Sequence, residues 1–230
     1  SILFGLLGFI GTFYSAQFHY ENVNINIVWS LIFPLIVAMI WGRRYGCISI
    51  TLGLTALYPF YLGGYNGWAN LVPSFSLFLW VMLLGYGAEK QLQDKKFYYN
   101  IYFLQSIYIL IRVILYFTVF PWLYQFNPPL WYPAAHTTIE YKIILTFAVK
   151  NGIFDCILFA ICDVLLLLPF IKKIFKLECP KTSRYNTGVV LSVTATGILF
   201  TLIVLIFNYY IIDRISSFQW LLNPSSNILM

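Results

Sequence analysis

The chain has 230 residues, of which 60% are hydrophobic and only 10% are charged, and its mean hydropathy is +0.79. This balance excludes an ordinary soluble globular domain and predicts a protein that lies in lipid. The net charge of +6 would suggest nucleic acid in a soluble protein, but most basic residues here stand in short loops beside apolar stretches. Such loops favour contact with the lipid bilayer and its anionic headgroups, so we expect no nucleic-acid partner.

Seven apolar stretches predict an all-α fold, a polytopic transmembrane helix bundle of about seven spans within a range of six to eight. A helix that crosses a bilayer needs about 20 apolar residues. Several of the stretches are shorter than this, so one of them can be re-entrant rather than spanning. The stretches lie at about residues 1–18, 26–41, 47–63, 71–87, 99–124, 142–171 and 188–212.

Composition divides this single membrane domain into parts. Residues 1–87 are rich in glycine, which lets helix backbones approach closely in lipid, so we expect a tight helical core there. Residues 99–212 hold longer spans, and residues 213–230 form an amphipathic tail that is expected to lead to a further module. Because the chain starts without a methionine or a cleavable signal pattern, we expect a piece of a longer protein.

Basic and non-basic loops alternate along the chain and predict its orientation. Ten of the fourteen basic residues lie in three loops, whereas the intervening loops carry no Lys or Arg. By the positive-inside rule the basic loops are cytoplasmic, and we expect a multi-pass protein of the bacterial inner membrane. The basic loops are 42–46, 88–97 and 172–184, and the intervening loops are 19–25, 64–70 and 125–141.

Four polar residues inside apolar stretches form the sharpest candidate site. Arg112 lies near the middle of one long span and Asp155 near the middle of the next. At about 1.5 Å of rise per residue, antiparallel neighbours would place Arg112 level with Asp155 and Gln105 level with Asp163. Ionised groups at this depth are costly, so they pair or line a wet cavity. The two pairs either fix helix packing or form a sensing element. Lys150 is expected either to snorkel toward the membrane surface or to face another partner.

A second candidate site is the turn between residues 63 and 70, which contains Asn66, Trp68 and Asn70 among several glycines. Flexible glycine backbone, a flat aromatic side chain and two side-chain amides are features of small-molecule binding sites. They are equally the components of a tight interfacial hairpin, and this second interpretation is favoured.

Familiar enzyme chemistry lacks its usual motifs in this segment, because there is no GxSxG, HExxH, P-loop or kinase signature. Enzymatic activity therefore stays undecided. The cysteines lack CxxC spacing and the two histidines lack the spacing of metal ligands, so we expect no disulfide framework, no metal and no cofactor. These residues are Cys47, Cys156, Cys162, Cys179, His19 and His136.

The first half of the chain resembles a known class of membrane domains. The stretch Pro34–Gly53 places an apolar span, a basic turn flanked by Gly42 and Gly46, and a second apolar span in order, and a glycine-threonine-aromatic segment, Gly8–Tyr14, precedes it. These features are similar to the membrane input region of LytS-type bacterial sensors, over roughly residues 5–90. The resemblance implies a signal-transduction protein that responds to an unidentified small molecule or membrane signal.

The last part, at residues 169–178, 207–213 and 218–222, resembles membrane segments that precede PAS, histidine-kinase or diguanylate-cyclase modules. This implies a sensor of the two-component type whose cytoplasmic output domain lies outside this chain, and sensors of this kind commonly form homodimers. Seven crossings would put the end of the chain outside the cell, so a cytoplasmic output domain requires one stretch to be re-entrant. The full-length protein would then be a histidine kinase or a diguanylate cyclase.

An alternative is a substrate-binding subunit of an energy-coupling-factor vitamin transporter. The early pattern of proline, apolar span, glycine and basic turn is similar to the first helices of those proteins, which are of comparable length. They usually have six spans, and their small-residue docking pattern is suggested here only by Gly5, Gly8 and Gly11. The sensor is the preferred hypothesis, with helix rearrangement as its means of passing on the signal.

Overall fold

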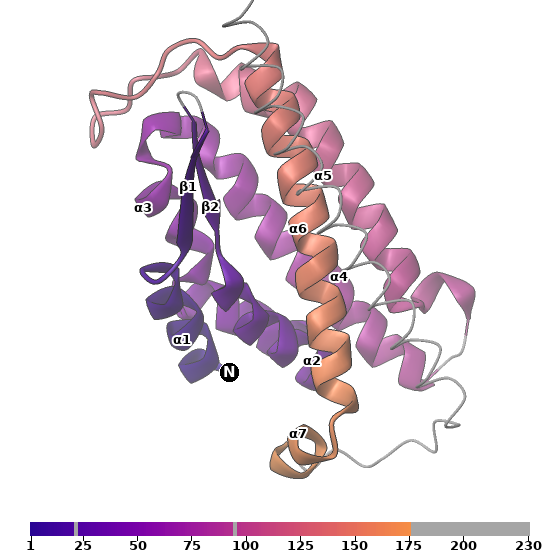
Figure 1. Ribbon diagram of the computed structural model, residues 1–230. Coiled ribbons are helices and arrows are strands. Elements are labelled where there is room, and N and C mark those ends of the chain that lie inside the picture. Colours follow the sequence, from indigo (N-terminus) through magenta and orange to yellow (C-terminus); the bar gives the residue numbers. More distant parts are fainter. Residues whose placement is uncertain (21–22, 94–95, 176–230) are drawn as a thin grey trace, which may run out of the picture. The chain divides into compact units, whose positions relative to one another are not determined.

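The computed structural model describes residues 1–20, 23–93 and 96–175 (Figure 1). The predicted span at 188–212 and the predicted tail at 213–230 lie outside these residues. The α-helices are α1 (Ile2–Thr12), α2 (Ile32–Leu52), α3 (Tyr58–Leu62), α4 (Leu71–Gln93), α5 (Ile101–Tyr124), α6 (Tyr141–Leu167) and α7 (Pro169–Ile174). Strands β1 (Ala16–Tyr20) and β2 (Val23–Ile27) and the 3-10 helices η1 (Trp29–Leu31), η2 (Thr55–Leu57), η3 (Gly64–Asn70) and η4 (Phe97–Tyr99) complete the described elements.

By length and composition alone, four helical segments of the described chain qualify as candidate membrane spans. They support the prediction of a helical membrane protein, whereas the count of seven spans is not confirmed. The segments are Trp29–Leu52, Gly64–Gln91, Ile101–Tyr124 and Tyr141–Leu166.

The predicted span at 1–18 is not a single helix. Helix α1 ends at Thr12 after 11 residues, which is about 16 Å of rise and only half of a bilayer core. The chain then forms an antiparallel hairpin in which Ala16 pairs with Ile27 and Tyr20 with Val23. Apolar and polar residues alternate in Val23–Ile27, which is the period-two pattern of a strand. This pattern explains why a hairpin follows α1 in place of a continuous span and a loop.

Helix α2 is two short helices that meet at Gly42, and the chain reverses there. A Cβ atom placed on Gly46 would come within 2.7 Å of the Cβ of Ala38, eight residues earlier, whereas eight residues of straight helix span about 12 Å. Gly42 has φ 84° and ψ −176°, a conformation open essentially to glycine alone. Each arm rises about 15 Å, so Trp29–Leu52 dips and returns rather than crossing once.

The reversal is held against α4. Glu89 accepts a hydrogen bond from the backbone N–H of Arg43 at 2.9 Å, and its second carboxylate oxygen lies 3.4 Å from the Arg43 Nε atom. A Cβ on Gly85 would meet the Arg43 Cα at 2.6 Å, so the turn lies directly on the α4 backbone. The predicted basic turn at 42–46 is thus a helix-to-helix reversal anchored by one carboxylate.

The predicted stretch at 47–63 is also broken. The second arm of α2 ends at Leu52, and Leu54 takes a left-handed conformation with φ 62°, after which η2 and α3 follow. The glycines of α1 pack against both arms: Gly8 lies beside Pro34 from the first arm and Thr55 from the segment that follows the second. The helical pieces within residues 1–62, including the two arms of α2, are therefore packed through glycine, and each is shorter than a bilayer core.

Helices α4, α5 and α6 follow as longer elements that contact one another in chain order (Figure 1). Asn100 caps α5 by accepting a hydrogen bond from the Tyr102 N–H at 2.8 Å. The buried residues of α5 recur almost every four positions and so share one face, which is turned toward α4 and α6. They are Leu104, Gln105, Tyr108, Arg112, Tyr116, Phe120 and Tyr124.

Candidate functional site

The predicted ion pair between Arg112 and Asp155 is present and joins α5 to α6. The Arg112 Nη1 atom donates to the Asp155 carboxylate, and both residues are only 3% exposed. The Tyr108 hydroxyl donates to the same carboxylate at 3.0 Å and accepts from the guanidinium at 2.7 Å. A buried pair with this third member is costly to disrupt, because either charge left alone would be desolvated without compensation.

A second layer of aromatic contacts surrounds the ion pair. Trp80 on α4 stacks on Tyr108 with ring centroids 5.5 Å apart and donates its indole N–H to the Gln105 side-chain oxygen at 2.6 Å. Within the described residues, the Arg112 Nε atom and the Gln105 amide nitrogen have no hydrogen-bond acceptor.

The predicted contact between Gln105 and Asp163 is wrong. Gln105 is bonded to Trp80, and the Asp163 carboxylate accepts from the Tyr102 hydroxyl instead. Each of these two polar side chains instead accepts a hydrogen bond from an aromatic side chain on a neighbouring helix. Helix rise alone does not predict such aromatic partners. Asp163 contacts α5 at Tyr102, three residues before Gln105, so the predicted partner is the part that differs.

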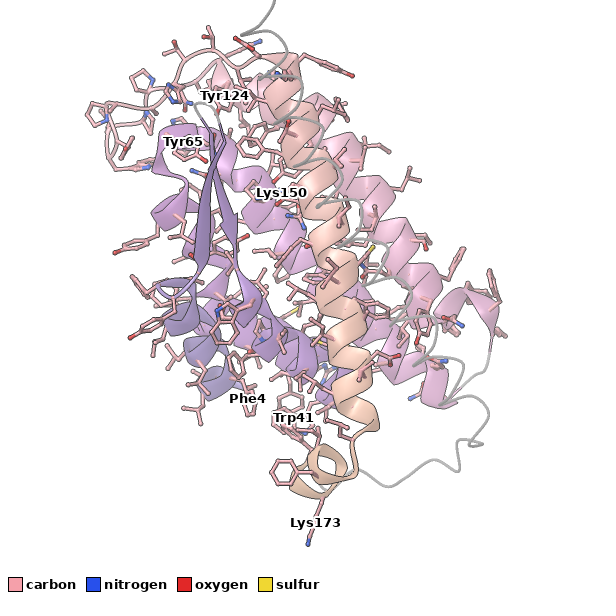
Figure 2. All side chains as sticks on the ribbon, viewed as in Figure 1. Phe4, Trp41, Tyr65, Tyr124, Lys150 and Lys173 are labelled. Carbon is pink, nitrogen blue, oxygen red and sulfur yellow. The ribbon has the colours of Figure 1, made fainter. Side chains whose placement is uncertain are left out.

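A pocket of about 60 Å³ opens between α3, η3, the start of α4, α5 and α6. Asn66 and Asn70, two of the three residues predicted in the turn, line it and are 7% and 2% exposed. We call it the Lys150 pocket, because this lysine is the only lining residue with a formal charge; Lys150 and Tyr65 are labelled in Figure 2. The full lining is Tyr58, Pro59, Leu62, Gly63, Tyr65, Asn66, Asn70, Pro73, Tyr116, Phe120, Phe147, Lys150 and Asn151.

Trp68, the third predicted residue, does not line the pocket. Its ring packs edge-on against Trp131, with centroids 4.5 Å apart, and its backbone N–H donates to the Asn127 side chain at 2.9 Å. The Asn127 amide also donates to the backbone oxygens of Asn66 at 3.0 Å and His136 at 2.7 Å. Asn127 thus joins the loop after α5 to the η3 turn. Trp68 belongs to this contact between the loop and the turn, not to the pocket lining.

The side-chain amides of the η3 turn also stabilise its conformation, in addition to the contacts with the loop after α5. Asn70 donates to the Gly63 oxygen at 2.7 Å and closes the turn on itself. The Tyr124 hydroxyl at the end of α5 donates to the Asn66 side-chain oxygen. The sequence offered a tight turn and a ligand site as alternatives, and the same two amides serve the turn while facing the pocket.

The pocket and the ion pair are connected through Tyr116 and Asn151. Tyr116 lines the pocket, accepts a hydrogen bond from Asn151 at 2.8 Å, and holds its ring 5.8 Å from the Arg112 guanidinium carbon. Lys150 lies close enough to interact electrostatically with both Arg112 and Asp155. The pocket and the ion pair therefore have Tyr116 as a shared neighbour.

Sequence reasoning missed the residues that connect the two sites. Tyr108, Tyr116 and Tyr124 stand at eight-residue intervals on α5 with Arg112 midway between the first two, which places all four on one helical face. That spacing was a usable signal, whereas the contribution of Asn127 depends on a loop conformation that no periodicity predicts.

No family model, curated protein or solved structure matches this chain.

Proposed function

We propose that this chain is the membrane-embedded sensing domain of a bacterial signal-transduction protein. A small ligand binds in the Lys150 pocket at the non-basic end of the bundle. Its presence changes the packing of α5 against α6 through Tyr116 and the pair formed by Arg112 and Asp155. The observation that carries the proposal is this physical continuity between a ligand-sized pocket and a buried ion pair across two apolar helices.

A sensing role requires that the ligand favour one of two helix arrangements, since a ligand with equal affinity for both shifts neither. The ion pair is suited to such a choice, because a charge pair in an apolar interior is either made or broken and has few intermediate states. The rearranged helices would pass the signal to an output domain beyond this chain, on the cytoplasmic side given by the basic loops.

The vitamin-transporter alternative shares the pocket but makes different demands. A vitamin-sized ligand needs a pocket of about 300 Å³ or more, which exceeds the present volume of about 60 Å³. That size favours the sensor. Co-purification of the chain with ATPase subunits, together with tight binding of a vitamin, would favour the transporter instead.

Filling the pocket is expected to abolish ligand stabilisation. Leu62→Trp adds an indole to the lining, whereas Leu110→Trp places the same ring on a surface of α5 that is 62% exposed. The purified chain would be screened by thermal unfolding with a panel of small carboxylates, amides, amines and sugars. We expect at least one compound to raise the unfolding temperature of the wild-type chain and of Leu110→Trp, but not of Leu62→Trp. Equal stabilisation of both variants would place the binding site elsewhere.

A further inference from the structure

The Lys150 pocket has a charge and donor pattern that points to one class of ligand. Of its thirteen lining residues, Lys150 alone carries a formal charge, and the remaining polar groups are amides and phenols. The positive charge of Lys150 attracts an anion through electrostatics, alongside the contacts that Lys150 makes within the protein. The lining is therefore cationic, in surroundings where apolar walls strengthen electrostatic attraction.

One neutral polar group of the lining, the Tyr116 hydroxyl, also presents a donor. The Asn66 side-chain oxygen already accepts a hydrogen bond from the Tyr124 hydroxyl, so this oxygen is engaged within the protein. Tyr116 accepts from Asn151, so its own hydroxyl proton is directed elsewhere. A ligand that meets the Tyr116 hydroxyl can therefore supply an acceptor atom to it.

The size and the apolar walls restrict the ligand further. A volume of about 60 Å³ holds about four water molecules, which corresponds to a molecule of a few heavy atoms. Phe120, Phe147 and Pro73 form apolar parts of the wall and suit a short hydrocarbon body. A carboxylate on a short alkyl chain satisfies the charge, the donors and the walls together.

We propose that the Lys150 pocket binds a small monocarboxylate of about two to four carbons, with its carboxylate at the Lys150 ammonium and its alkyl end against Phe147 and Phe120. This rests on the proposed function, because it names the ligand class of the same pocket. A charge-assisted contact with an ammonium distinguishes such a ligand from its neutral amide isostere.

The test is isothermal titration calorimetry on the full chain in nanodiscs of phosphatidylcholine, with sodium acetate, propionate and butyrate against acetamide, propionamide and butyramide. We expect at least one carboxylate to bind about 10- to 100-fold more tightly than its amide. Lys150→Met should remove this difference, and Lys150→Arg should retain most of it. Lys142→Met, a neutralisation at an exposed position of the same helix, should leave it unchanged.

The outcomes separate the ligand class from the proposed function. Equal affinity for carboxylate and amide, or tighter binding of propylammonium, would overturn the monocarboxylate while leaving a ligand-binding pocket in place. Failure of all three carboxylates to bind would overturn it as well, and the pocket-filling comparison of Leu62→Trp with Leu110→Trp would then decide the proposed function by itself. The preference of the wild-type chain for carboxylate over amide needs no variant, so it stands even if Lys150→Met does not fold.

Discussion

Replacing Asp155 by Asn is expected to destabilise the bundle by about 3 to 5 kcal/mol, since it leaves the Arg112 guanidinium charged without its counterion in an apolar interior. Arg112 is 3% exposed and cannot turn to water without moving α5. The free energy of unfolding would be measured by titration with sodium dodecyl sulfate in mixed micelles. Asp163→Asn is the matched control, because Asp163 is only half-buried and the asparagine oxygen can still accept from Tyr102.

The coupling within this pair is measured by a double-mutant cycle. Arg112→Met combined with Asp155→Asn removes both charges, so this double variant should be more stable than Asp155→Asn alone and should recover most of the loss. If Asp155→Asn costs no more than Asp163→Asn, or if the effects of the single variants simply add, the two charges are not coupled.

Gly42→Ala is expected to destabilise the chain by about 2 to 4 kcal/mol, which makes it the second large effect. A φ of 84° with a ψ of −176° is strained for any residue with a Cβ, at a cost of about 1 to 3 kcal/mol. The added methyl would also come within 2.6 Å of the Glu89 Cγ atom and displace the carboxylate from the Arg43 N–H. The loss of that charge-assisted bond adds to the strain.

Gly152→Ala provides the control for this change, measured by the same detergent titration. A Cβ on Gly152 meets only an Ile109 methyl at 3.8 Å, which is ordinary van der Waals contact, so the variant should be neutral or gain up to about 1 kcal/mol from helix propensity. If Gly42→Ala behaves like Gly152→Ala, the chain does not reverse at Gly42 in the folded protein.

The part of the site that the sequence predicts correctly rests on helix geometry. Arg112 and Asp155 are ionised groups near the centres of two consecutive apolar stretches, and antiparallel neighbours with equal rise must bring them level. The same argument fails for Gln105 and Asp163, because level alone does not choose a partner. In a chain that is 20% aromatic, the indole of Trp80 and the phenol of Tyr102 compete for those polar groups.

The predicted spans are least accurate where glycine controls the backbone. Hydropathy treats residues 26–41 and 47–63 as two spans, yet Gly42 folds the chain into arms too short to cross, and the second stretch breaks at Gly53 and Leu54. Sharp reversals of this kind depend on single φ values and on one carboxylate from a distant helix. Neither contributes to a hydropathy average, so the helical class could be predicted while the number of crossings could not.

Hydrogen exchange of α5 and α6, followed by mass spectrometry, tests most directly whether the pocket communicates with the ion pair. The wild-type chain and Asp155→Asn would be compared with and without the compound that gives the largest thermal stabilisation. We expect ligand to change exchange in peptides that cover residues 105–112 and 155–163, although Gln105, Arg112, Asp155 and Asp163 do not line the pocket, and we expect this distant change to be lost in Asp155→Asn. Protection confined to residues 58–70 and 147–151 in both proteins would show that the pocket binds without signalling through the ion pair.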